Sequence, residues 1–141
     1  MEQLLIEFIN TLDQALKKMQ QQVDDGIGFS RLTISQFQYL DAIHQLGNPT
    51  ITELANQLQI TKASVTAGVT RLIGLGYVEK TQSQEDRRVF HVKLTHAAGR
   101  IVKARSQTLK EYGEFIRNSL TQEEAFQFEK ILAKLVSSFG Q

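Results

Sequence analysis

The sequence contains no cysteine and only one proline among its 141 residues. The absence of cysteine excludes disulfide bonds, thiolate catalysis, cysteine-ligated zinc and sensing by thiol oxidation. No apolar run approaches the ~18 residues that a membrane-spanning helix needs. Glu2 and Glu7 stand where a signal peptide would be basic. We therefore expect a soluble, cytoplasmic protein.

Signatures of catalysis are also missing. The chain has no phosphate-binding loop, nucleophile elbow or dinucleotide fingerprint. Its histidines, His44, His91 and His96, fall on three different expected elements without the spacing of metal ligands. We therefore expect no enzyme activity, no metal site and no cofactor. The length and the 41% apolar content indicate one folded unit over residues 1–141.

Charge is distributed unevenly along the chain, although the formal net charge is only +1. Residues 61–105 hold nine basic and three acidic side chains, a net of +6. The flanking segments are acidic, with −4 over residues 1–60 and −1 over residues 106–141. A basic middle between acidic flanks indicates a polyanion-binding segment, and a chance asymmetry is the alternative that charge alone leaves open.

Two helices are predicted before this basic segment. Apolar residues spaced by three and four from Leu4 to Val23 predict an amphipathic helix that ends at the glycines that follow. Thr33 and Gln36 have the spacing of a capping box and predict the start of a second helix. The single proline, Pro49, follows its end.

Two short helices are predicted next, within "TITELANQLQI" and "TKASVTAGVTRLIGLG". Thr52 is the expected N-cap of the first and Thr61 that of the second, and a tight turn over residues 59–61 joins them. The second helix ends at Gly74 and Gly76. It has small and hydroxyl side chains opposite its apolar face.

After Gly76 the apolar period changes from helical to alternating. Residues 77–81 and 89–95 predict two strands of a hairpin with a charged tip, "QSQEDRR", at residues 82–88. A long helix to Leu120 is then expected after Thr95. A final helix begins at the "TQEE" capping box that starts at Thr121.

A short helix, a tight turn, a second helix and a charged hairpin together describe a winged helix-turn-helix. Such a helix fits the major groove, where hydroxyls donate to phosphates or base edges and methyl groups contact thymine. A hairpin beside it reaches the flanking minor groove, which favours an inserted arginine. In the helix that follows Thr61, the candidate DNA-contact residues are Lys62, Ala63, Ser64, Val65, Thr66, Thr70 and Arg71.

Four short motifs occur in a fixed order in this region. They are Leu-Thr with a glutamine three residues after the threonine at 32–36, "KASVT" at 62–66, Asp-x-Arg at 86–88, and "VKLT" with a later glycine at 92–99. Their order and spacing resemble the MarR family of bacterial and archaeal transcription regulators.

The resemblance implies a mainly α (α+β) fold, a winged helix-turn-helix with a two-stranded wing and long terminal dimerisation helices. Residues 32–95 would form the DNA-binding region, and residues 1–25 and 96–141 the dimerisation region. It further implies a homodimer that binds a palindromic site on double-stranded DNA, usually as a repressor, with release by a small molecule as a further expectation. Independently, the terminal helices carry more apolar side chains than one small domain easily covers.

The wing residues are assigned by the same resemblance. It implies that Arg88 enters the minor groove and that Asp86 orients it. Arg87 is counted with them, and contact with phosphate or with water both stay open for it. Many family members have an arginine where this chain has Ala67, so the target sequences of relatives do not transfer.

One alternative function and one open site remain. A winged helix can also serve as a protein-interaction module without specific DNA binding, and salt-insensitive association would favour that reading. Phe8, Tyr39, His44 and Tyr112 are aromatic candidates for an effector pocket, but side chains at helical spacing are more often core. The sequence therefore assigns no effector residue.

Overall fold

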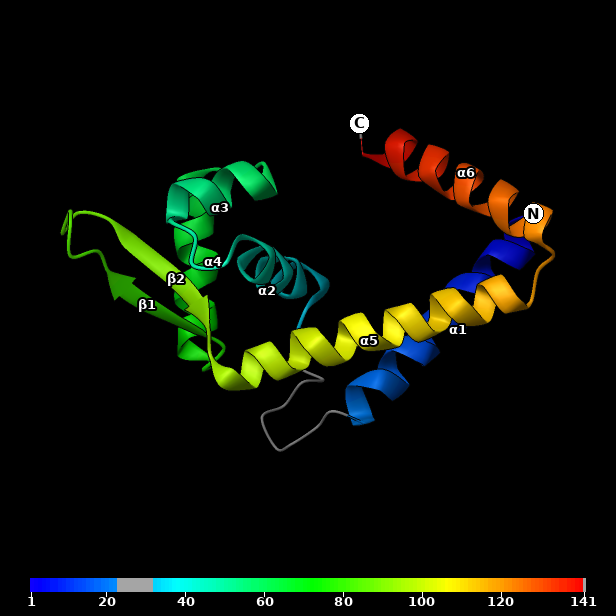
Figure 1. The fold of residues 1–141 in the computed structure, drawn as a ribbon, viewed down its shortest axis with the longest axis horizontal. Coiled ribbons are helices and arrows are strands. Elements are labelled where there is room, and N and C mark those ends of the chain that lie inside the picture. The colour runs from blue at the N-terminus through cyan, green and yellow to red at the C-terminus, as the bar shows by residue number, and fades with distance from the viewer. Residues whose placement is uncertain (23–31, 141) are drawn as a thin grey trace. The chain divides into compact units, whose positions relative to one another are not determined.

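The computed structural model describes residues 1–22 and 32–140, and it is mainly helical with one two-stranded antiparallel sheet (Figure 1). The chain divides into two compact units, residues 1–105 and residues 106–141. The predicted mainly α fold with a two-stranded wing is confirmed. In chain order the elements are α1 (Glu2–Gln22), α2 (Ile34–Leu46), α3 (Ile51–Leu58), α4 (Lys62–Gly74), β1 (Val78–Gln82), β2 (Phe90–Leu94), α5 (His96–Asn118) and α6 (Gln122–Phe139).

The core of the first unit joins α2, α3, α4, both strands and the first turns of α5. Apolar side chains from each of these elements are removed from water there, which is the main stabilising term of a small domain. The core needs all of these elements together, because no single short helix could bury its apolar face alone. Its largest fully buried side chains are Leu40, Ile43, Leu54, Leu72, Ile101, Val65, Val69 and Val92.

Threonine caps begin several of the helices, and one prediction about them was wrong. Thr33 accepts a hydrogen bond from the backbone N–H of Gln36 at 3.1 Å, so that predicted capping box is confirmed. The N-cap of α3 is Thr50 and not Thr52. Glu53 lies three residues after Thr50, and its backbone N–H donates to the Thr50 hydroxyl. The Glu53 carboxylate in turn accepts from the Thr50 backbone N–H at 3.2 Å, which completes a capping box. The residue three positions after Thr52 is an alanine, whose side chain cannot accept a hydrogen bond from a backbone N–H.

The predicted turn between α3 and α4 is confirmed, and it is tight. Gln59 adopts a left-handed backbone conformation with φ 54°, the only non-glycine positive φ in the part of the chain that the structure describes. This conformation ends α3, and the N–H of Ile60 donates to the carbonyl of Ala55 at 3.2 Å. Thr61 then caps α4, as predicted.

The two strands form the predicted hairpin, each within one residue of its expected start. Glu79 faces Lys93 across the pair, and their charged groups lie 3.4 Å apart. The N–H of Val92 also donates to the carbonyl of Pro49 at 2.9 Å. The hairpin is therefore held by hydrogen bonds between its two strands and by one to the segment just before α3.

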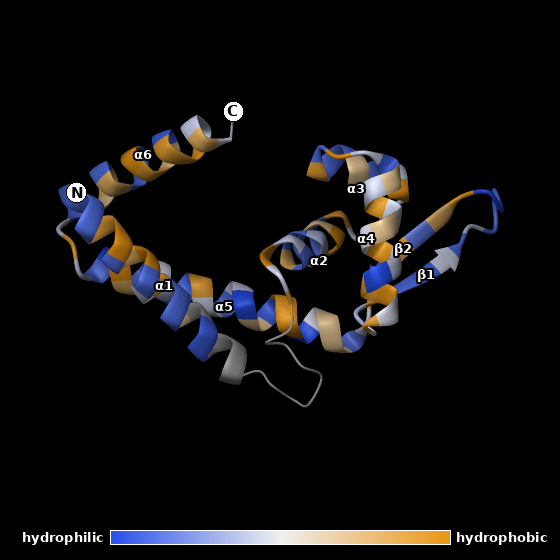
Figure 2. Cartoon of the chain, turned by 180° about the vertical axis from the view of Figure 1, so that it is seen from behind, coloured by the Kyte–Doolittle hydropathy of each residue, from blue (hydrophilic) through white to orange (hydrophobic). Residues whose placement is uncertain are grey.

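The long helices α1, α5 and α6 are amphipathic, and their apolar stripes are visible in Figure 2. α5 ends at Asn118, slightly before the predicted Leu120. The predicted end of the first helix falls after Gln22, outside the described residues. Over residues 1–22 and 32–140, no helix combines the length and apolar character required to cross a bilayer.

Candidate nucleic-acid interface

The α4 helix separates its predicted contact residues into two faces. Lys62, Ala63, Ser64, Thr66, Thr70 and Arg71 are exposed. Val65 is fully buried, and it lies in the core with Val69 and Leu72. The prediction that the Val65 side chain contacts DNA is therefore corrected, because that side chain holds α4 to the rest of the domain and cannot reach a base.

The hydroxyl groups of α4 have defined hydrogen-bond roles. Thr66 donates to the carbonyl of Lys62 at 2.9 Å, and Thr70 donates to the carbonyl of Thr66 at 2.7 Å. Their protons are therefore used within the helix, and their oxygens keep lone pairs that can accept. The Ser64 hydroxyl accepts from Thr61 at 2.9 Å, so its own proton is available to donate. The exposed face can thus accept from base amino groups and donate to a phosphate or a base.

Tyr39 of α2 supports α4 from inside, a role that the sequence analysis missed. Its hydroxyl donates to the carbonyl of Ser64 at 3.2 Å, and burial raises the pKa of that hydroxyl, which keeps it a neutral donor. Its ring lies against Gly68, where an added Cβ would be 2.6 Å from Tyr39 Cζ. A glycine in a helix interior, which costs stability relative to alanine, was the available signal of this close approach.

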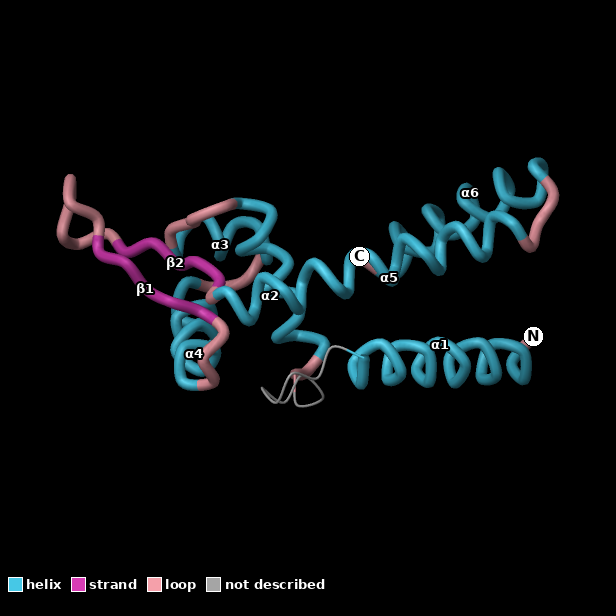
Figure 3. The backbone as a smooth tube through the Cα atoms, turned by 60° about the horizontal axis from the view of Figure 1, so that its bottom comes forward, coloured by secondary structure: helices cyan, strands magenta, loops and turns pink. Residues whose placement is uncertain are grey.

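Asp86 and Arg88 form a two-point ion pair at the tip of the wing, which Figure 3 shows as the loop beyond the strands. Arg88 Nε and Nη2 donate to the two Asp86 carboxylate oxygens at 3.2 and 3.3 Å. The same carboxylate accepts from the Arg88 backbone N–H at 3.0 Å. These hydrogen bonds lower the pKa of the Asp86 carboxyl below its usual value. The Arg88 side chain has the larger effect on this pKa, and the Arg88 backbone N–H has the smaller one. The Arg88 side chain is 91% exposed, so it projects from the wing with its direction already restricted.

Two further wing side chains have partners that the sequence did not indicate. Gln82 Nε2 donates to the carbonyl of Arg87 at 2.6 Å. The ammonium group of Lys80 lies 4.3 Å from the centre of the Phe90 ring, a cation–π contact that braces the hairpin. Residues of the tip therefore have hydrogen-bond partners within the hairpin, although the Arg88 side chain stays exposed.

Histidine is used structurally in this unit. His91 Nδ1 lies 2.8 Å from the carbonyl oxygen of Asn48, next to the point where β2 meets the chain before α3. Within the described ranges, no group of three or more His, Cys, Asp or Glu side chains is placed to hold a metal ion.

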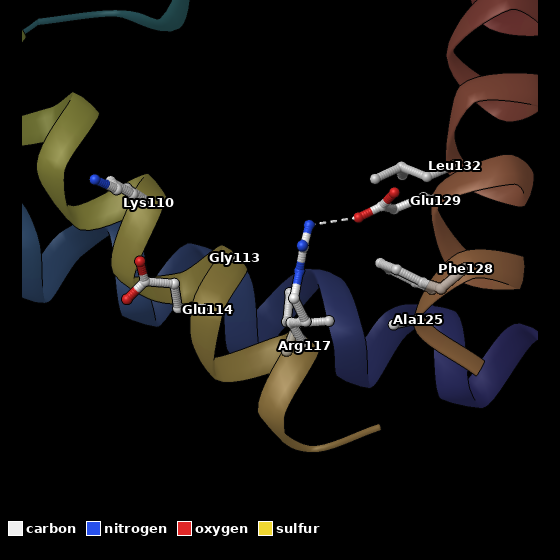
Figure 4. A pocket seen from close by; sticks show the side chains of 9 residues that line it. Lys110, Gly113, Glu114, Arg117, Ala125, Phe128, Glu129 and Leu132 are labelled. Atoms are coloured by element: carbon white, nitrogen blue, oxygen red, sulfur yellow. Dashed lines mark hydrogen bonds and ion pairs between the residues drawn. The ribbon is translucent and has the colours of Figure 1, made fainter. Parts of the chain in front are cut away.

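The second unit contains an open groove of about 660 Å³ between the end of α5 and α6 (Figure 4). Arg117 donates to Glu129 across it at 2.7 Å. Its remaining lining is largely apolar, with the charged groups of Lys110 and Glu114 at its α5 side. The lining residues are Lys110, Gly113, Glu114, Ile116, Arg117, Ala125, Phe128, Glu129 and Leu132.

Comparison with known proteins places this arrangement in a family. A sequence model described as the MarR family matches residues 32–90. An uncharacterised HTH-type transcriptional regulator of Bacillus subtilis, YsmB, is 32% identical over 104 residues, which cover 74% of this chain and 71% of that protein. The HTH-type transcriptional regulator PrsX of Escherichia coli is 30% identical over 130 residues, which cover 88% of this chain and 76% of that protein.

Solved structures show the same fold. The crystal structure of Streptococcus pneumoniae FabT in complex with DNA superposes with a TM-score of 0.75 at 23% identity, over 99% of this chain and 98% of that one. The likeness extends over the terminal helices as well as the winged region.

Proposed function

This chain belongs to the MarR family, and from that premise we propose that it is a transcriptional regulator that binds double-stranded DNA in a sequence-specific way. The curated relatives are named as transcriptional regulators and not as enzymes, in agreement with the predicted lack of catalysis.

One observation carries the proposal: a helix with an exposed face of small polar side chains and a wing whose arginine is already paired with an aspartate are joined by one hydrophobic core. On α4, Lys62 and Arg71 would neutralise phosphates, and the hydroxyls of Ser64, Thr66 and Thr70 would contact phosphate or base edges. Ala63 would let the helix backbone approach closely. Because this chain has Ala67 where many family members have an arginine, recognition of the base sequence would depend more on these small groups and on DNA shape.

The wing would supply the minor-groove contact. Arg88 would enter the narrow groove, where the negative potential is strongest, while Asp86 restricts its direction. Arg87 lies beside it and is exposed, so it would reach the adjoining phosphate backbone.

The test is selection of bound duplexes from a random library, followed by affinity measurements at several salt concentrations. We expect a defined site and an affinity that falls steeply with salt, since phosphate contacts release counterions. Recovery of no preferred duplex, or salt-insensitive binding, would favour the protein-interaction alternative.

We also propose that two copies form the active species, with residues 1–25 and 96–141 as the dimerisation region and 32–95 as the DNA-binding region. The terminal helices expose apolar side chains that water does not favour, and α6 buries none of its residues. A two-fold dimer would place two α4 helices one DNA turn apart, roughly 34 Å, and would therefore read a palindrome. The exposed apolar side chains of α1 and α6 include Leu4, Phe8, Ile9, Phe126, Ile131, Leu135, Val136 and Phe139.

The oligomeric state has its own test. In sedimentation experiments, Leu135→Glu should dissociate the dimer, because a carboxylate replaces an apolar side chain in the proposed interface. Gln127→Glu makes the same charge change on the polar face of α6 and should leave the dimer intact. A monomeric parent protein, or equal effects of the two substitutions, would contradict the proposal.

Repression and release by a small molecule complete the proposal, and both rest on the family resemblance. A ligand that favours one separation of the two α4 helices would change DNA affinity by its differential affinity for the two arrangements. The measurement is operator affinity with and without each member of a panel of small organic molecules, combined with transcription from the selected site.

A further inference from the structure

The peptide group between Arg87 and Arg88 is held at both of its ends by side chains. Its carbonyl oxygen, that of Arg87, accepts a hydrogen bond from Gln82 Nε2 at 2.6 Å. Its N–H, that of Arg88, donates to Asp86 Oδ1 at 3.0 Å. Two hydrogen bonds therefore restrict the orientation of the peptide plane that precedes the Arg88 side chain.

Gln82 can reach this carbonyl because of its place in the hairpin. It is the last residue of β1 and pairs with Phe90, the first residue of β2. Immediately beyond it, the N–H of Ser83 donates to the carbonyl of Val89 at 2.8 Å and closes the loop. The Gln82 side chain thus spans the base of the loop that contains both arginines.

We propose that Gln82 is a second positioning residue of the wing, which acts on DNA through Arg88 and does not itself touch the duplex. This inference rests on the proposed function. Asp86 limits the guanidinium directly, while Gln82 limits the backbone that bears it. Restricting both before binding lowers the conformational entropy that the wing loses when the arginine enters a groove.

The first experiment compares Gln82→Met with Gln84→Met on the selected duplex. Methionine keeps the length of glutamine but cannot donate to the Arg87 carbonyl. Because the loss of one hydrogen bond changes an equilibrium by a modest factor, we expect Gln82→Met to weaken binding about 3- to 10-fold. Gln84→Met makes the same chemical change at an exposed residue of the same loop and should bind like the parent protein.

A double-mutant cycle then asks whether Gln82 acts through Arg88. In an Arg88→Ala background, Gln82→Met should have no further effect on affinity, so the two losses are not additive. Equal losses in both backgrounds would overturn the inference, because Gln82 would then contact DNA or act on the fold independently.

A spectroscopic measurement on the free protein separates positioning from general stability. In Gln82→Met, the ¹³C resonance of the Arg87 carbonyl should shift and the Arg88 amide should exchange faster, with the resonances of α4 unchanged. Unchanged Arg87 and Arg88 signals would overturn the inference. Failure of the parent protein to select any duplex would instead refute the proposed function, so the two failures are distinguishable.

Discussion

Replacing Gly68 by alanine should destabilise the protein, although alanine is the better helix former. A Cβ at this position would lie 2.6 Å from Cζ and Oη of Tyr39 and 2.8 Å from its Cε1. The ring would have to move by roughly 0.8 Å to reach ordinary contact in a close-packed interior. It has little room to do so, because Tyr39 is only 8% exposed and its hydroxyl is bonded to the carbonyl of Ser64.

The opposing terms can be compared directly. Alanine gains about 1 kcal/mol of helix propensity over glycine in a helix interior. Overpacking costs about 1–3 kcal/mol, and loss of the Tyr39 hydrogen bond costs about 1 kcal/mol. The expected net loss in the free energy of unfolding is therefore about 1–3 kcal/mol for Gly68→Ala.

Urea unfolding at one fixed protein concentration measures this loss, because the apparent stability of the proposed dimer would depend on concentration. Gly99→Ala in α5 is the matched control, since an added Cβ there meets no atom within 4 Å. It should stabilise the protein by about 0.5–1 kcal/mol. A Gly68→Ala protein as stable as the parent would show that the Tyr39 ring yields freely, and the packing argument would be refuted.

Three more predictions follow from the wing and the helix caps. Arg88→Ala should lower DNA affinity and flatten its salt dependence, whereas Lys103→Ala, the same charge change on α5, should have little effect in binding titrations. NMR titration should find the pKa of the Asp86 carboxyl below the ordinary value for an aspartate, and Arg88→Ala should raise that pKa, because it removes the side-chain hydrogen bonds that stabilise the carboxylate. The Asp86 contribution to stability is then present above the unfolded-state pKa and disappears as the pH falls through the lowered folded-state pKa. Thr121→Ala should reduce the free energy of unfolding by about 1 kcal/mol, because it removes the capping box of α6, and thermal unfolding measures it. A variant with unchanged stability would show that this cap contributes nothing.

Local chemistry made most of the fold predictable. The capping boxes at Thr33 and Thr121 depend on two side chains three residues apart, so the sequence contains all the information they need. The alternation on both sides of the charged tip predicted the hairpin for the same reason. The wrong choice of Thr52 over Thr50 shows the limit, because two threonines competed and only the position of Glu53 distinguishes them.

Contacts in the candidate site were predictable only where both residues belong to one short sequence motif. The pairing of Asp86 with Arg88 joins residues two apart, and the structure contains it. The support of α4 by Tyr39 joins residues 25 apart in the chain, so no local pattern revealed it. Gln82 was missed for a different reason, since its partner is a backbone carbonyl, which every residue has.

By itself, the sequence determined the order of the elements, the basic segment and the residues of the wing tip, because periodicity, capping and charge act over a few neighbouring residues. The sequence also predicted a polar face of α4 opposite an apolar one, but only the tertiary structure decided that Val65, one of the candidate DNA contacts, is unavailable to DNA. Val65 belongs to the motif that identified the helix, yet it is fully buried, while its neighbours Ser64 and Thr66 are exposed. Burial depends on what packs against a helix from distant parts of the chain, and that is settled only when the core assembles.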